Sequence, residues 1–259
     1  MASPLRYFAA PRLDHATLVI AFEGWNDASE AASHALRFLR DSYRCVPLAD
    51  IDCEEFYDFT VRRPETRILP GARRGIEWPG VRFHLGSIDA RRELVTGLGA
   101  EPHLRWRAFC DLVDELVQRL ALREVVLVGA YLADVVYSRP VVVTGYSDEA
   151  ALLESIGVAA SGYEGPVGIL GVLQERLQRR GTRVVSLWAA LPHYISAAPN
   201  PRGALALVEA LAGYLELSID LAPLRREAAE FEEKISALVA ADPELADYVR
   251  ELKKRDFAQ

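Results

Sequence analysis

The sequence predicts an α/β fold in which a mostly parallel sheet is covered by helices on both faces. Short apolar runs, which are typical of buried strands, occur at 17–22, 125–129, 140–144 and 183–188. Longer segments between and after these runs repeat their apolar residues at helical spacing. Strands that alternate with helices of this length indicate three layers, α/β/α, around one central sheet.

The predicted helices have recognisable ends. Asp27, with Glu30 three residues later, forms a plausible capping pair for the helix after the first strand. Asn200 is a good N-cap, because Pro201 then occupies the first helical position. The expected helices follow Asp27 and cover approximately 106–120, 148–156, 166–181 and 200–215.

The chain of 259 residues is expected to contain one large domain with a helical extension. We expect a single α/β/α domain over 1–220 and a C-terminal extension over 221–259. A β-rich excursion is expected at 53–90, because 56–61 alternates like a half-buried strand and 76–80 indicates a turn and an edge.

The C-terminal extension is predicted to be a helical hairpin. Its first helix carries apolar residues at heptad spacing, and a second helix begins at 242–244. Two helices this short bury too little surface to be stable alone, so their apolar seam must pack on the chain's own body or on a neighbouring subunit. We favour the neighbour and expect a homo-oligomer of cyclic symmetry. The candidate oligomer contacts are Leu224, Phe231, Ile235, Leu238, Leu245 and Leu252.

Composition excludes several classes of partner. The formal net charge of −7 repels phosphate backbones, so nucleic acid is not an expected partner. No run of about 18 apolar residues occurs, and we expect neither membrane spanning nor export. Three cysteines without a C-x-x-C spacing favour a reducing cytoplasm over a disulfide framework.

Two glycine-containing turns are candidate anion sites. The turn Gly24-Trp25-Asn26-Asp27 lies between a strand and a helix, where backbone N–H groups could hold an anion. The favoured interpretation is a capped turn with a buried Trp25, since Asp27 would oppose an anion. The spacing Gly165-x-x-Gly168-x-x-Gly171 matches neither a dinucleotide fingerprint nor a P-loop, and close helix packing is favoured there.

His193 and three arginines are the remaining candidates. His193 follows a predicted strand end and could act as a base, although a structural hydrogen-bonding role is favoured. Arg139, and the pair Arg62-Arg63, each precede a proline and could contact a carboxylate of a ligand or, more often, of the protein. The histidines have no metal-binding spacing, no G-x-S-x-G motif is present, and we expect no metal or cofactor.

Several segments together resemble the proteasome assembly chaperone type 2 family, in particular its bacterial, actinobacterial-like branch. The resemblance covers approximately residues 13–215. It rests on Gly24-Trp-Asn-Asp-Ala28, Phe56-Tyr-Asp58 with Arg63-Pro64, Gly99-Ala-Glu-Pro102 with Trp106, Arg139-Pro140, Gly162-Tyr-Glu-Gly-Pro-Val-Gly168, Trp188-Ala189, Pro192-His-Tyr194 and Pro199-Asn-Pro201. It implies a three-layer fold similar to nucleoside phosphorylases and hydrolases, an oligomer, and no established reaction.

The sequence departs from the family pattern in two places. It has Val136-Tyr-Ser-Arg-Pro140 where the family often has Pro-His-Thr-Arg-Pro, so a role for that histidine does not transfer. Archaeal relatives dock on proteasomes through a C-terminal motif with a penultimate tyrosine. The final residues here, Arg255-Asp-Phe-Ala-Gln259, do not support that docking mode.

Two functions remain open. The favoured hypothesis is a non-enzymatic, assembly-chaperone-like or protein-binding protein, with a proteasome connection suggested by the resemblance alone. The alternative is a nucleoside- or phosphate-binding enzyme, for which Asn26, Arg139, Tyr163 and His193 should converge on one pocket. The complete candidate pocket comprises Gly24, Trp25, Asn26, Asp27, Arg139, Tyr163, Gly165, Gly168, His193 and Asn200.

Overall fold

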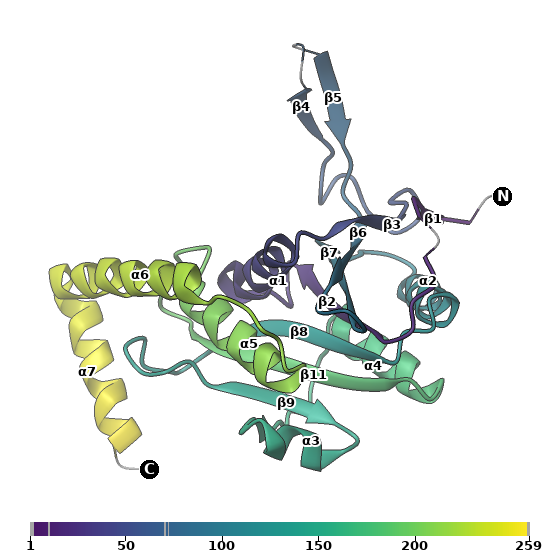
Figure 1. Ribbon diagram of the computed structural model, residues 1–259. Helices are drawn as coiled ribbons and strands as arrows, with labels where there is room; N and C mark the ends of the chain where they lie inside the picture. The colour runs from purple at the N-terminus through teal and green to yellow at the C-terminus, as the bar shows by residue number, and fades with distance from the viewer. Residues whose placement is uncertain (1–2, 10, 70, 72, 258–259) are drawn as a thin grey trace.

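The computed structural model describes residues 3–9, 11–69, 71 and 73–257 and contains one large sheet with helices on both faces (Figure 1). The strands are β1 (Leu5–Tyr7), β2 (Ala16–Glu23), β3 (Val46–Ile51), β4 (Glu65–Leu69), β5 (Arg73–Glu77), β6 (Val81–Ser87), β7 (Glu93–Ala100), β8 (Glu124–Ala133), β9 (Val143–Ser147), β10 (Ala159–Ala160) and β11 (Arg183–Pro192). The helices are α1 (Ala31–Ser42), α2 (Trp106–Arg119), α3 (Ala150–Ser155), α4 (Ile169–Arg179), α5 (Pro201–Tyr214), α6 (Ala222–Ala241) and α7 (Pro243–Phe257).

The central sheet has nine strands in the order β1-β3-β6-β7-β2-β8-β11-β9-β10. Its middle is parallel, because β7, β2, β8 and β11 pair in the same direction. Antiparallel pairs lie outside this middle, with β6 on one side and β9 on the other. All four strands predicted from apolar runs are therefore neighbours in one sheet. The strand predicted at 140–144 is shifted and begins at Val143, which pairs with Ala189 of β11.

Each face of the sheet is covered by its own helices, as the three-layer prediction requires. Alternate residues of β2 point to opposite faces, so Ile20 packs with α2 and α4 while Val19 packs with α1 and α5. Both residues are fully buried. A strand with two apolar faces is typical of a parallel sheet covered on both sides, and this explains the continuous apolar run at 17–22.

The excursion at 53–90 differs in detail from the prediction. Residues 56–61 form turns instead of a half-buried strand, because the N–H of Tyr57 bonds to the carbonyl of Cys53 and that of Val61 bonds to the carbonyl of Asp58. The Asp58 side chain also accepts the N–H of Thr60, a local bond that competes with strand pairing. Beyond these turns, β4 and β5 form a separate antiparallel hairpin that stands away from the body (Figure 1).

The C-terminal helices pack on the chain's own α/β body. Leu224 of α6 belongs to the same apolar cluster as α5, and Ile235, Val239 and Val249 join α6 and α7 to the loop after β11 through Ile195. The strict heptad register predicted for α6 is wrong at its end, because Leu238 is 60% exposed whereas Val239 is buried. A straight α-helix has about 3.6 residues per turn, so positions repeated at strict heptad spacing gradually rotate around it. The residues of α6 that face the body therefore follow the helical spacing and depart from the heptad positions.

Among the described residues, none of the helices has the length and apolar character needed to cross a membrane.

Candidate functional site

The candidate site lies at the carboxyl edge of the parallel strands. Strands β7, β2, β8 and β11 end there at Ala100, Glu23, Ala133 and Pro192. Ligands of open α/β sheets usually bind at this edge, because loops and helix N-termini gather there. Turn 24–30 and the loops at 134–142 and 193–200 follow three of these ends, and α4 begins beside them.

Glu101 occupies the N-terminus of α4. Its Oε1 atom accepts the backbone N–H of Ile169 at 2.8 Å and the side-chain amide of Asn26, also at 2.8 Å. Asn26 is completely buried, and its backbone carbonyl oxygen accepts the N–H of Ala130 on β8. One carboxylate thus joins the ends of β7, β2 and α4. The role of Glu101 was not predicted; the available signal was a carboxylate directly after a parallel strand.

Gly168 is required by close packing and leaves no space for a phosphate at this point. A Cβ atom at this position would lie 2.3 Å from Asn26 Oδ1 and 2.7 Å from Glu101 Oε1. The contact supports the packing interpretation of the glycine spacing. The helix N-terminus that could have held an anion instead holds a carboxylate of the protein.

Asp27 caps α1, although not as the predicted pair with Glu30. Its Oδ1 accepts the N–H groups of Ala32 at 2.7 Å and Ser33 at 3.1 Å, after a 3₁₀ turn at Ala28–Glu30. Glu30 adopts a positive φ and forms no side-chain cap bond. Burial raises the pKa of Asp27, against the hydrogen bonds from Ser33 and Ala32 that lower it.

The prediction of a buried Trp25 is wrong. Its side chain is 61% exposed, because the turn directs Asn26 inward and leaves its neighbour outside.

Asn200 caps α5 as predicted. Its Oδ1 accepts the N–H groups of Arg202 and Gly203, each at 3.1 Å, and Pro201 is the first helical residue. The N-termini of α1, α4 and α5 are therefore all capped by oxygen atoms of the chain itself. Because those N–H groups are the usual anion ligands of such folds, the edge does not offer them to a phosphate.

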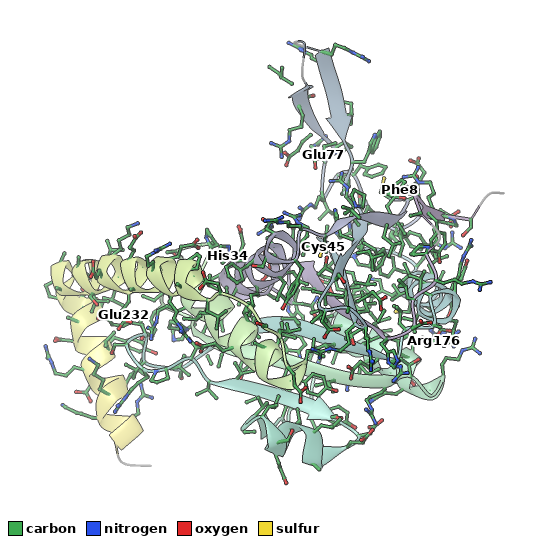
Figure 2. The ribbon with its side chains drawn as sticks, in the orientation of Figure 1. Phe8, His34, Cys45, Glu77, Arg176 and Glu232 are labelled. Carbon is green, nitrogen blue, oxygen red and sulfur yellow. The ribbon has the colours of Figure 1, made fainter. Side chains whose placement is uncertain are left out.

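Arg139 and Asn200 line a cavity of about 300 Å³ between the body and the C-terminal helices. Within it, the Arg202 guanidinium donates to the Arg139 carbonyl at 2.7 Å and lies 3.5 Å from Glu232 of α6. Figure 2 marks Glu232 on the side of α6 that faces the body. These contacts join the predicted edge to the C-terminal hairpin.

His193 lies outside this cavity and holds α7 against the body. Its Nε2 atom is 2.8 Å from the Tyr248 hydroxyl and 2.9 Å from an Asp134 carboxylate oxygen. Tyr163 is 63% exposed, and its hydroxyl donates to the carbonyl of Pro166 at 2.9 Å. The candidate residues therefore separate into Asn26 with Gly168, Arg139 with Asn200, and His193 with Tyr248, and do not line one shared pocket.

Exposed apolar side chains surround the same edge, and of these Trp25 and Tyr163 were selected as candidates from the sequence but the others were not. Trp25 follows β2, Leu104 follows β7, Leu132 is the penultimate residue of β8, and Tyr163 and Val167 precede α4; all are exposed. Large apolar side chains gathered at a functional edge are typical of surfaces that contact other proteins. Burial cannot be read from a loop sequence, so no local signal distinguished these residues from core residues.

No group of three or more His, Cys, Asp or Glu residues capable of holding a metal ion occurs within the described parts of the chain.

The fold and the edge together define a class: a three-layer α/β protein whose usual ligand edge is capped from within and surrounded by exposed apolar side chains. The model of the PAC2 family matches residues 21–239, and the chain belongs to this family.

Solved structures agree with that assignment. A PAC2 family protein from Streptomyces avermitilis is 39% identical, with a TM-score of 0.83 over 90% of this chain and 99% of that one. A proteasome-assembly chaperone homologue from Mycobacterium tuberculosis is 40% identical, with a TM-score of 0.81 over the same shares. An archaeal proteasome activator from Pyrococcus furiosus, 19% identical, shares the fold with a TM-score of 0.72 over 90% of this chain and 97% of that one. None of the curated proteins matches the chain.

Proposed function

We propose that the protein is a non-enzymatic, assembly-chaperone-like protein that binds proteasome-related proteins in the cytoplasm through the carboxyl edge of its sheet. The observation that carries this proposal is the capping of α1, α4 and α5 by Asp27, Glu101 and Asn200. The helix N-terminal N–H groups that would bind an anionic substrate at that edge are paired with these side chains. The exposed side chains around them are apolar, and such side chains favour a protein partner.

Family membership supports a partner connected with proteasomes. Two similar proteins carry proteasome-related names: the chaperone homologue of Mycobacterium tuberculosis and the activator of Pyrococcus furiosus. The first is similar enough in sequence for the comparison to bear on function, whereas the second supports the fold.

Trp25 provides the sharpest test of the surface. Tryptophan is enriched among residues that dominate binding energy, and this one protrudes from a turn whose backbone is held by buried contacts. We expect the protein to bind proteasome subunits or the 20S core particle of its own organism in analytical ultracentrifugation. Trp25→Ser should weaken that binding by about tenfold or more.

A matched control is available at the other end of the molecule. Phe8 is also 61% exposed, and Figure 2 marks it beside β1, far from the edge. Phe8→Ser should leave binding unchanged. Absence of binding to the core particle and to its free subunits contradicts the proposal, and so does equal weakening by both variants. A thermal-shift response to nucleosides or orthophosphate at the edge would favour the enzyme alternative.

We also propose that the protein forms a homo-oligomer. The β4–β5 hairpin exposes Ile68 and Ile76, and a two-stranded hairpin is marginally stable without a covering partner. Leu224, Ile235 and Leu252 are buried within the single chain, which leaves Leu238 as the most exposed of the C-terminal residues proposed as contacts. Light scattering should report a molar mass above that of one chain, and Ile68→Ser with Ile76→Ser should lower it. A monomeric parent protein contradicts this part.

A further inference from the structure

A second cavity, of about 320 Å³, lies at the base of the β4–β5 hairpin, and arginine is the most frequent residue in its lining. Helix α1 contributes Arg37 and Arg40, the segment before β4 contributes Arg62 and Arg63, β4 itself contributes Arg67, and β6 contributes Arg82. Figure 2 marks Glu77, a further lining residue, at the base of the hairpin. The cavity therefore lies between the sheet, α1 and the projecting hairpin.

The charges in this cavity do not balance. Six arginines line it against the three glutamates Glu23, Glu65 and Glu77, a formal excess of three positive charges in a chain whose net charge is −7. All three glutamates are already paired with arginines, Glu65 with Arg67 alone and the other two with two arginines each. Glu23 pairs with Arg37 and Arg62, and Glu77 pairs with Arg67 at 3.0 Å and Arg82 at 3.1 Å.

Two arginines have no carboxylate of the cavity as a partner. Arg40 pairs with its neighbour Asp41, whose side chain is mostly exposed. Arg63 forms no hydrogen bond or ion pair with any residue in the described part of the chain. Because a guanidinium carries five N–H donors, the shared arginines also retain unused donors. A concave surface that holds such a surplus concentrates a positive potential.

His84, which also lines the cavity, responds to this potential. Its pKa is lowered first by burial and then by the nearby charges of Arg40 and Arg82. The imidazole is therefore a built-in reporter of whether the surplus charge has been neutralised.

The geometry points to a binding site for a small multivalent anion that carries two or more phosphate groups. Arginine forks match phosphate oxygens in pairs, and guanidinium groups approach this cavity from three structural elements. A volume of about 320 Å³ is at the small end of ligand sites, which favours a small molecule over a helix or a nucleic acid strand. Trp78 stands at the cavity, partly exposed and packed edge-on against Phe59, and gives it one apolar wall.

Such an anion would join the hairpin to the body. Its phosphates would contact Arg63 before β4 and Arg40 on α1, whose side chains are not bonded to each other in the described part of the chain. Binding is thus expected to fix the position of the projecting hairpin relative to α1. This role is separate from the partner-binding edge at Trp25.

Calorimetry with inorganic tripolyphosphate, at constant ionic strength and without divalent cations, tests the site. We expect saturable binding of one tripolyphosphate per chain, at least tenfold tighter than orthophosphate. Arg63→Gln and Arg40→Gln should each weaken binding about tenfold, while Arg250→Gln on the exposed face of α7 should have no effect. In NMR titrations, saturation with tripolyphosphate should raise the pKa of His84.

Three results would overturn the proposal: no saturable binding, equal affinity in the Arg63→Gln and Arg250→Gln proteins, or a His84 pKa that does not change at saturation. A polyglutamate peptide that binds as tightly as tripolyphosphate would overturn the assignment of phosphate chemistry and indicate an acidic protein segment instead. Circular dichroism of each variant separates loss of binding from loss of fold.

Discussion

The carboxyl edge and the arginine cavity contain similar polar groups but differ in how those groups are compensated. At the edge, the helix N-termini face Asp27, Glu101 and Asn200, and their N–H groups are paired within the chain. In the cavity, six arginines face three glutamates and leave a positive surplus. A glycine-containing turn between a strand and a helix is therefore not by itself evidence of an anion site, because the helix N–H groups can be paired within the chain. An uncompensated charge in a concave surface is better evidence.

Removing the Glu101 carboxylate from the edge should reduce the stability of the folded protein more than any other substitution proposed here. Glu101→Ala leaves the amide of the buried Asn26 and the N–H of Ile169 without their acceptor. We expect the free energy of unfolding to fall by about 2–3 kcal/mol in urea denaturation, because buried unsatisfied donors are costly. Glu101→Gln retains an acceptor oxygen and should lose less than half as much. An alanine variant as stable as the parent would show that the edge is not internally compensated.

Gly168→Ala tests the packing of the same edge. The added methyl would lie 2.3 Å from Asn26 Oδ1, and that side chain is held by its bond to Glu101. Thermal or urea denaturation should show a loss of about 2 kcal/mol, typical of overpacking. Gly162→Ala is the matched control, because a Cβ there meets nothing within 4 Å and should change stability by less than about 0.5 kcal/mol. Equal results for both variants would remove the packing argument.

Asp27→Asn tests the charge of the α1 cap. The pKa of Asp27 is raised in the folded protein, so the folded state binds a proton more tightly than the unfolded state. Its contribution to stability therefore falls as pH rises from 3.8, the ordinary pKa of an aspartate carboxyl, through the raised pKa of the folded state. Asparagine retains the acceptor oxygen without the charge.

The free energy of unfolding of Asp27→Asn, relative to the parent, should thus increase with pH across this window and level off above it. Urea denaturation at a series of pH values between about 4 and 7 measures the difference. A difference that decreases with rising pH would show that hydrogen bonding outweighs burial at this carboxylate.

Arg63→Gln should have the smallest effect on stability. It tests whether the arginine cavity has an uncompensated positive charge. Since Arg63 has no ion pair among the described residues and the cavity has surplus positive charge, its loss should change stability by less than about 0.5 kcal/mol, toward greater stability at low salt. Arg37→Gln, which breaks the pair with Glu23, should destabilise instead. A clear loss of stability in Arg63→Gln would indicate that its charge is compensated within the protein.

Secondary structure was predictable where one local pattern decided the outcome. The apolar run at 17–22 predicted β2, and Asn200 with Pro201 predicted the start of α5, because continuous burial and an N-cap both leave a local signature. The prediction at 56–61 was wrong, since alternation alone cannot reveal that Asp58 will bond to its own backbone neighbours.

The candidate site was predicted less well, for a related reason. Placing Asn26, Gly168 and Asn200 at the carboxyl edge followed from the order of strands and helices. The contacts that those residues make could not be predicted from that order. Glu101 is separated from Asn26 by 75 positions, and only the pairing of β2 with β7 brings the two side chains together.

The arginine cavity shows the same limit. Arg62 and Arg63 were recognisable as candidates for carboxylate pairing, but the sequence did not indicate that Arg62 would pair with Glu23, 39 positions away. Their charge balance depends on α1 and β6, which join them only in the folded chain.

Local patterns in the sequence were sufficient to identify the α/β class, the main strands and helices, and the family. Apolar periodicity and capping residues act over a few positions, so they can be recognised without knowing the fold. Three other features could be seen only in the folded chain. The helix N-termini at the carboxyl edge are capped by oxygen atoms of the protein, and the C-terminal helices pack on the α/β body of the same chain. Six arginines also come together at the base of the β4–β5 hairpin. Those outcomes depend on which distant charges and surfaces come into contact, and a carboxylate that arrives from another strand turns a potential site into a structural contact.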